Sequence, residues 1–161
     1  MNDTYRKLLA LLDEKAVAYR LIDHEQEGQT EKVSALRGNP LAAAAKCIIL
    51  IVKLGKKTTR FVLAVVPGDR RVDIGKARAL FPGATYVGFA ASEVAERLAG
   101  SVAGTVLPFA MHPHVTVIAD PGLQANPELF FNAARLDQSL ALSTADYLAV
   151  AQPRLESIAT S

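Results

Sequence analysis

The chain has 161 residues, of which 50% are apolar and 21% are charged, with 10 glycines and 8 prolines. This mixture excludes collagen, a coiled coil and extended disorder, and we expect a single domain over residues 1–161. A formal net charge of +2 does not by itself require a polyanionic partner.

The sequence carries no sign of export or of membrane insertion. Its longest apolar runs, Cys47–Val52 and Phe61–Val66, are far shorter than the roughly 20 residues that span a bilayer. The N-terminus lacks the ordered regions of a secretory signal, and the single cysteine cannot form an internal disulfide. We therefore expect a cytoplasmic protein with no membrane partner.

Helices and strands are predicted from the first residues onward. Behind Thr4, a good N-cap residue, apolar residues recur at helical spacing at Tyr5, Leu8, Leu9 and Leu12. A strand follows over Val17–Ile22, and a short helix over Thr30–Leu36 ends at Gly38-Asn39-Pro40.

A hairpin is predicted next. Lys46–Leu54 and Thr59–Val66 are apolar and rich in β-branched residues, and Gly55-Lys56-Lys57-Thr58 joins them. Their continuous apolarity predicts burial on both faces.

The second half alternates irregularly between strands and short helices. Helices are predicted over Ile74–Phe81, capped by Asp73, and over Glu93–Ala99. A last helix opens at Thr144 and closes at Pro153. Short strands are predicted at Tyr86–Phe89, Thr105–Leu107, Val115–Ala119, Leu129–Asn132 and Ser139–Leu142. The pattern favours a mixed α/β fold with a curved mixed sheet packed with short helices.

Positive charge is concentrated in one segment. Between Lys53 and Arg78 lie eight Lys or Arg residues and two Asp residues, which gives +6 there and leaves the rest of the chain negative. Such a segment can contact phosphates, or can simply form solvated turns and helix faces. The candidates for phosphate contacts are Lys56, Lys57, Arg70 and Arg71.

Two reactive residue types point more weakly to chemistry. His112-Pro113-His114 offers two imidazoles, and Asp120 a third metal ligand, but no further ligand stands at a suitable spacing, so we expect neither a metal nor another cofactor. Cys47 begins an apolar strand, where a thiol is usually inert packing.

Lys46 is the only charged residue between Pro40 and Val52. It either reaches water from the end of its strand or holds a phosphate or carboxylate in a pocket. The loop from Gly104 to Pro108 is a second candidate, because glycine permits close backbone approach and the loop's N–H groups can hold a carbonyl oxygen. Alone, this spacing is usually just a turn.

Taken together, these motifs resemble a known family. An N-terminal motif comprises His24-Glu25, Gly28, Thr30-Glu31-x-Val33-Ser34 and Arg37-Gly38. It is followed by Lys46, Gly104-x-x-x-Pro108, and Asn132-Ala133-Ala134 with a strand at Ser139. This order resembles the YbaK family of aminoacyl-tRNA deacylases, which includes the editing domain of bacterial prolyl-tRNA synthetases.

Further motifs are similar to the YeaK branch of that family, the free-standing trans-editing proteins called ProXp-ST. They are Pro108-Phe109, His112-Pro113, Ala119-Asp120-Pro121, Phe131-Asn132-Ala133, Leu136-Asp137-x-Ser139, Thr144-Ala145-Asp146-Tyr147-Leu148 and Ala151-Gln152-Pro153. The resemblance runs from about Leu8 to Leu155.

The resemblance implies a YbaK-like fold and hydrolysis of the ester that joins a wrong amino acid to the 3′ adenosine of tRNA. It makes Lys46, Gly104 and Pro108 the catalytic candidates: the lysine contacts the tRNA 3′ end, and the loop backbone orients the aminoacyl group. Ser139 falls where relatives place a polar pocket residue, and relatives usually have glycine where this chain has Ala134.

The reaction needs little from the protein, because an aminoacyl ester is activated and the neighbouring 2′-hydroxyl can assist attack. The branch is associated with Ser and Thr on tRNA. Recognition of their hydroxyl would fall to Ser139, Asn132 or His112, and His24 and Thr30 are further candidates for substrate binding. Aminoacyl-tRNA is the expected partner, with a synthetase or elongation factor as further partners and no DNA.

Two other function classes remain open. A non-catalytic module that binds tRNA or a synthetase would keep the basic segment, and a metal-dependent hydrolase would use His112, His114 and Asp120. Measuring deacylation with and without a chelator distinguishes the metal-independent deacylase from the metal-dependent hydrolase. Binding of tRNA without hydrolysis identifies the non-catalytic module.

Overall fold

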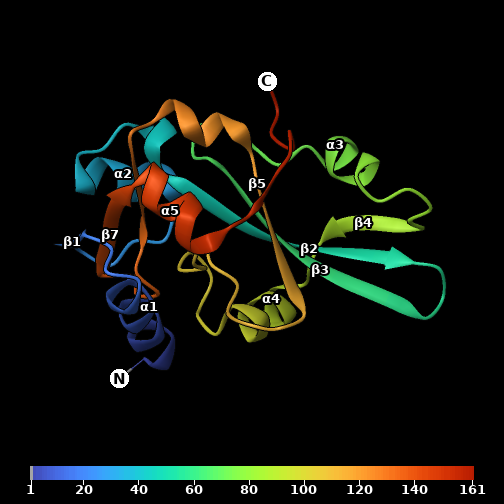
Figure 1. The fold of residues 1–161 in the computed structure, drawn as a ribbon, viewed down its shortest axis with the longest axis horizontal. Coiled ribbons are helices and arrows are strands. Elements are labelled where there is room, and N and C mark those ends of the chain that lie inside the picture. Colours follow the sequence, from blue (N-terminus) through green and yellow to red (C-terminus); the bar gives the residue numbers. More distant parts are fainter. Residues whose placement is uncertain (1) are drawn as a thin grey trace.

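The computed structural model describes residues 2–161 and has the predicted mixed α/β architecture (Figure 1). Its α-helices are α1 Asp3–Glu14, α2 Thr30–Arg37, α3 Ile74–Ala79, α4 Ser92–Ala99 and α5 Thr144–Ala151. Its strands are β1 Tyr19–Asp23, β2 Ala45–Leu54, β3 Thr58–Pro67, β4 Tyr86–Phe89, β5 Val115–Ala119, β6 Glu128–Asn132, β7 Gln138–Ser143 and β8 Arg154–Leu155. Two short 3-10 helices are η1 Leu41–Ala43 and η2 Pro121–Ala125. No helix within residues 2–161 combines the length and apolarity needed to cross a bilayer.

The strands form two sheets where one curved sheet was expected. The smaller sheet is antiparallel, in the order β1-β7-β6. The larger has the order β4-β2-β3-β5-β8, with β2 antiparallel to β3 and β4, and β5 parallel to β3 and β8. A parallel bridge between Ala44 and Phe130 links the start of β2 to β6. The two sheets therefore meet where β2 begins.

The predicted hairpin of β2 and β3 is confirmed, and its turn projects beyond the rest of the molecule (Figure 1). Successive residues of its inner half enter opposite sides of the sheet. Leu63 and Val65 belong to one buried cluster, whereas Val62 and Ala64 belong to another. Burial on both faces is thus confirmed for the inner half, and the residues at 58–60 are exposed.

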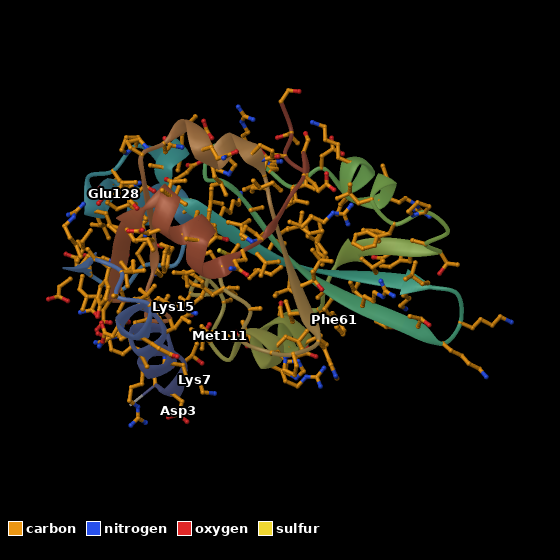
Figure 2. All side chains as sticks on the ribbon, in the orientation of Figure 1. Asp3, Lys7, Lys15, Phe61, Met111 and Glu128 are labelled. Atoms are coloured by element: carbon orange, nitrogen blue, oxygen red, sulfur yellow. The ribbon has the colours of Figure 1, made fainter. Side chains whose placement is uncertain are left out.

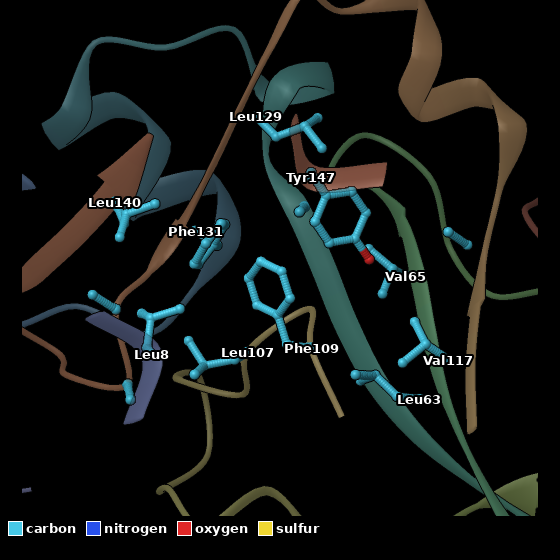
Figure 3. Close-up of a cluster of buried hydrophobic side chains, with 14 of the residues drawn as sticks. Leu8, Leu63, Val65, Leu107, Phe109, Val117, Leu129, Phe131, Leu140 and Tyr147 are labelled. Carbon is cyan, nitrogen blue, oxygen red and sulfur yellow. The ribbon is translucent and has the colours of Figure 1, made fainter. Parts of the chain in front are cut away.

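The larger buried cluster holds the loop after α4 in place. Phe109 packs edge-to-face against Phe131 and Tyr147, with ring centroids 6.0 and 5.3 Å apart (Figure 3). The Tyr147 hydroxyl donates a hydrogen bond of 2.8 Å to the Pro108 carbonyl, and Met111, labelled in Figure 2, packs against the same cluster. The far end of the Gly104–Pro108 loop is therefore fixed by the core.

Helix α1 is capped by Asn2 and not by Thr4. The Asn2 side chain accepts from the backbone N–H groups of Thr4 and Tyr5. The Thr4 hydroxyl instead donates to the Gly100 carbonyl at 2.6 Å. Thr4 therefore joins the start of α1 to the end of α4, a long-range role that local sequence cannot reveal.

The strand predicted over Thr105–Leu107 is wrong, because this segment is a loop. The Thr105 backbone N–H and hydroxyl both donate to the Val102 carbonyl, and Ser101 donates to the Thr105 carbonyl. These local bonds satisfy the polar groups that a sheet would otherwise pair.

Candidate active site

A cavity of about 170 Å³ opens where the two sheets meet. Its wall comes from α2, the start of β2, β6 and the loop at Gly104. Four of the candidate catalytic and substrate-binding residues line it together: Thr30, Lys46, Gly104 and Asn132. These residues are far apart in the chain, and the fold brings the motifs that carry the resemblance together in one place.

Lys46 stands at the start of β2, opposite Val66 of β3. Its Nζ lies 3.5 Å from the Arg70 carbonyl, a long hydrogen bond. In the part of the chain that the structure describes, no carboxylate forms an ion pair with it. Lys46 is therefore a cation on the cavity wall, available to an anionic or carbonyl oxygen.

Gly104 brings two motifs into direct contact. It has a φ of +85°, and a Cβ placed on it would lie 2.7 Å from the Gly28 Cα and 2.9 Å from the Gly28 carbonyl oxygen. Both features require glycine at position 104. A residue with a side chain rarely adopts this φ, and the backbone atoms of Gly28 cannot move away from a Cβ. The loop and the N-terminal motif thus share one wall of the cavity.

Asn132 ends β6 and is 6% exposed at the cavity. Its Oδ1 accepts from Arg37 Nη1 at 3.2 Å, and its Nδ2 donates to the Glu27 carbonyl at 2.8 Å. An amide nitrogen has two N–H groups, and the second has no partner among residues 2–161. Asn132 can therefore donate one hydrogen bond to a ligand in the cavity.

Ser139 is fully buried behind Asn132 and is not part of the cavity wall. Its Oγ lies 2.7 Å from His24 Nε2, 3.0 Å from Arg37 Nη1 and 3.2 Å from Asn132 Oδ1. The other ring nitrogen of His24 lies 2.7 Å from the Glu25 carbonyl. Ser139 donates its one hydroxyl proton to Asn132 Oδ1, and its oxygen accepts from Arg37 Nη1. His24 and Ser139 thus hold Asn132 and Arg37 from behind.

Arg37, the last residue of α2, is a candidate site residue that sequence reasoning did not name. It lines the cavity, and its guanidinium donates to Asn39, Asn132, Ser139 and Ser34. Burial lowers the pKa of Arg37 to about 10, which still leaves it charged at neutral pH. None of the ion pairs among residues 2–161 includes Arg37. The available signal was its place in the Arg37-Gly38 motif.

Other candidate residues lie outside the cavity. Pro108 is buried and does not line it, although Tyr147 anchors its carbonyl. His112 stands in the loop before β5, where its ring packs against that of His114 with centroids 4.9 Å apart. The structure therefore does not bring His112 to Asn132 or Ser139.

Asp120 does not join the histidines as a metal ligand. One carboxylate oxygen accepts from the backbone N–H groups of Ile158 and Ala159, both at 2.9 Å, and the other accepts from Gly122 at 2.8 Å. One oxygen thus holds the C-terminal segment, and the other caps η2. Residues 2–161 contain no group of three or more potential ligands placed to bind a metal ion.

Cys47 lines the cavity beside Lys46. Burial raises the pKa of its thiol well above the usual range. The raised pKa disfavours the thiolate, which is the reactive form of a cysteine.

The basic segment is divided between two places. Arg70 and Arg71 follow β3 at the cavity end, where the Arg70 carbonyl meets Lys46. Lys56 and Lys57 occupy the turn of the hairpin, about 30 Å away at the usual rise of a strand. The four residues therefore form two separate exposed pairs and not one patch.

A family comparison bears on the whole of this site. The family model described as the aminoacyl-tRNA editing domain matches residues 24–150, a range that contains every residue of the cavity wall. The chain belongs to the aminoacyl-tRNA editing family. The resemblance to YbaK-type deacylases is confirmed by this match.

Individual relatives agree with the family. The multifunctional Ser/Thr-tRNA deacylase ProXp-y of Escherichia coli (strain K12) is 37% identical over 153 residues, which are 94% of this chain and 90% of the relative. The protein of the same name from Escherichia coli O157:H7 matches equally.

Solved structures share the fold at lower identity. A crystal structure of a hypothetical protein superposes with a TM-score of 0.85 at 19% identity, covering 96% of this chain and 99% of that one. A candidate trans-editing enzyme for prolyl-tRNA synthetase gives 0.81 at 18% identity, covering 100% and 99%. The mixed α/β fold of the editing family is therefore shown.

Ala134 stands where the resemblance implies glycine. It is buried with a φ of +60°, in the left-handed region that glycine adopts without strain. The Asn2 side chain donates to its carbonyl. Alanine thus keeps the backbone that glycine would adopt, at a cost of about 1 kcal/mol.

Proposed function

We propose that this protein hydrolyses the ester of seryl- and threonyl-tRNA in trans, at the cavity lined by Lys46, Gly104 and Asn132. The observation that carries the proposal is the convergence of these residues from three distant segments on one cavity. The 37% identity to a Ser/Thr-tRNA deacylase supports the choice of substrate.

The residues divide the work of ester hydrolysis between them. The Lys46 ammonium holds an oxygen of the tRNA 3′ end by charge. The backbone N–H groups of the loop that begins at Gly104 orient the acyl carbonyl and stabilise its developing negative charge. The 2′-hydroxyl of the terminal ribose, placed next to the ester, assists the attack of water.

Asn132 recognises the hydroxyl of the amino acid. Its free amide N–H donates to that oxygen, while Arg37 and Ser139 fix the amide from behind. Ser139 therefore acts by positioning Asn132, and the direct contact first expected of Ser139 passes to Asn132. Serine and threonine differ by one methyl group, which an apolar wall discriminates by only about 1–3 kcal/mol. Both are therefore substrates.

The same proposal includes a cytoplasmic location, because aminoacyl-tRNA is made and used there. It also includes one domain over residues 1–161, and contact with an aminoacyl-tRNA synthetase or elongation factor that delivers the tRNA.

The test is deacylation of seryl-, threonyl-, alanyl- and cysteinyl-tRNA by the wild-type protein, Asn132→Ala and Ser139→Ala. We expect the wild type to prefer the first two, and Asn132→Ala to lose that preference. Ser139→Ala should weaken it less, because Arg37 still holds Asn132. A wild-type preference for alanyl- or cysteinyl-tRNA would show that the assigned specificity is wrong.

Arg37→Lys is expected to lower kcat/KM for seryl-tRNA by about 10- to 100-fold and the stability by about 1–3 kcal/mol. Lysine cannot reproduce the planar set of donors, so acceptors on Asn132 and Ser139 lose partners. The measurements are deacylation kinetics and thermal unfolding. Arg20→Lys is the control, because Arg20 is an exposed residue paired with Glu128. Equal kcat/KM and equal stability of the Arg37→Lys and Arg20→Lys variants would show that Arg37 has no role in the site.

Charge reversal of the basic pairs is expected to weaken tRNA affinity more than turnover of bound substrate. Arg70→Glu with Arg71→Glu, and separately Lys56→Glu with Lys57→Glu, should each lower the salt dependence of binding. The slope should fall by about 0.7–0.9 for each tRNA phosphate that the variant no longer neutralises. Filter binding at several salt concentrations measures this. If charge reversal of a pair leaves the salt dependence of tRNA binding unchanged, that pair is exposed to solvent and does not contact tRNA phosphates.

A further inference from the structure

A second hollow of about 270 Å³ adjoins the active-site cavity. It is more apolar, and its wall comes from the middle of β2, the end of β4, α4 and the loop at Gly104. Both hollows are lined by Cys47, Ile48, Gly104 and Val106. A ligand that reacts at the Gly104 loop therefore has room on both sides of it.

Phe89 is the aromatic residue of this second hollow. It ends β4, an edge strand, and 59% of it is exposed. An aromatic ring so open to water offers a face to a flat ligand. The surrounding side chains include Ile49, Ala90 and Ala95, which present apolar surface to the same space.

Charge distinguishes the two hollows. Lys46 and Arg37 line the active-site cavity, whereas Glu96 is the one charged residue among residues 2–161 that lines the second hollow. The Glu96 carboxylate accepts from the Ala103 backbone N–H at 2.7 Å. A phosphate is thus favoured beside Lys46 and repelled beside Glu96, while a neutral, planar group suits the second hollow.

The proposed substrate carries such a group. Its ester joins the amino acid to a ribose, and that ribose carries the terminal adenine base. With the acyl group in the polar cavity and the ester at the Gly104 loop, the base lies on the far side of the loop from Asn132.

We propose that the second hollow binds the 3′-terminal adenine base of tRNA, stacked on Phe89. The inference rests on the proposed function, because it takes aminoacyl-tRNA as the ligand. It adds a base-binding site beside the site of hydrolysis and makes Phe89 a binding residue.

The experiment uses seryl-RNA microhelices that end either in adenosine or in a ribose without a base. Losing one stacked base lowers binding by roughly 5- to 150-fold, so the wild type should hydrolyse the adenosine-ended ester better by that factor in kcat/KM. Phe89→Ala should bring the two substrates to within about 2-fold of each other.

Tyr86→Ala is the matched control. Tyr86 stands on the same strand, is 48% exposed, and does not line the second hollow; its ring lies near Lys53. This variant should keep the wild-type ratio between the two microhelices.

Each result decides the question. If the wild type hydrolyses both microhelices equally, or if Phe89→Ala keeps the wild-type ratio, the base-binding site is wrong while the deacylase proposal stands. If Phe89→Ala instead changes the preference between seryl and alanyl esters, the hollow holds the amino acid and the inference is overturned. If the wild type hydrolyses neither of the two seryl microhelices and does not hydrolyse seryl-tRNA, the proposed function itself is wrong.

Discussion

Replacing Lys46 by alanine is expected to lower the single-turnover rate of seryl-tRNA deacylation by about 10²- to 10³-fold. Loss of one preorganised donor at a reacting centre typically has this effect. Lys46 lines the cavity without forming an ion pair among residues 2–161, so its charge is available to the substrate. Lys46→Arg should also be impaired, because a planar fork does not replace a compact ammonium.

The fold of Lys46→Ala should remain intact. Its Nζ makes one long contact, 3.5 Å from the Arg70 carbonyl, so the thermal midpoint should change by no more than about 2 °C. Circular dichroism melting of the same preparation checks this. Wild-type deacylation by a well-folded Lys46→Ala protein removes Lys46 from the mechanism.

Gly104→Ala is expected to lower deacylation by about 100-fold and stability by about 1–3 kcal/mol. A Cβ at this position would lie 2.7 Å from the Gly28 Cα, and the φ of +85° is strained for alanine. The loop must therefore move away from Gly28, and a displacement of about 1 Å at a reacting centre can cost 100-fold in rate. Deacylation kinetics and denaturant unfolding measure the two effects.

Gly83→Ala is the control that separates the effect of backbone strain from the effect of the close contact with Gly28. Gly83 has a φ of +84°, but a Cβ there would meet nothing within 4 Å, and Gly83 does not line the cavity. This variant should lose stability from backbone strain and keep its activity. Equal activity of the Gly104→Ala and Gly83→Ala proteins would contradict a role for the close contact with Gly28.

Structural features that depend on residues close together in the chain can be predicted from the sequence. The hairpin of β2 and β3 follows from two apolar runs and a Gly-Lys-Lys turn, and Asp73 does cap α3. Lys46 stood out because it interrupts an apolar stretch. The strand predicted at Thr105–Leu107 is wrong, because the apolar residues of this loop enter the core from irregular backbone.

The support behind Asn132 was not predictable in the same way. Arg37 contacts Asn132 and Ser139 across 95 and 102 positions of sequence, and His24 contacts Ser139 across 115. No local periodicity encodes such contacts. The basic segment illustrates the converse, since Lys57 and Arg70 are close in sequence but stand at opposite ends of β3.

Catalysis at this cavity is tested most directly by single-turnover hydrolysis of seryl-tRNA. Purified protein in excess is mixed with labelled seryl-tRNA, and the loss of the ester is followed over time. A sample without protein gives the spontaneous rate, and a filter-binding assay measures binding of the tRNA. We expect the protein to release serine far faster than the spontaneous rate. Retention of the tRNA on the filter with the ester decaying at the spontaneous rate would contradict it and identify a binding module.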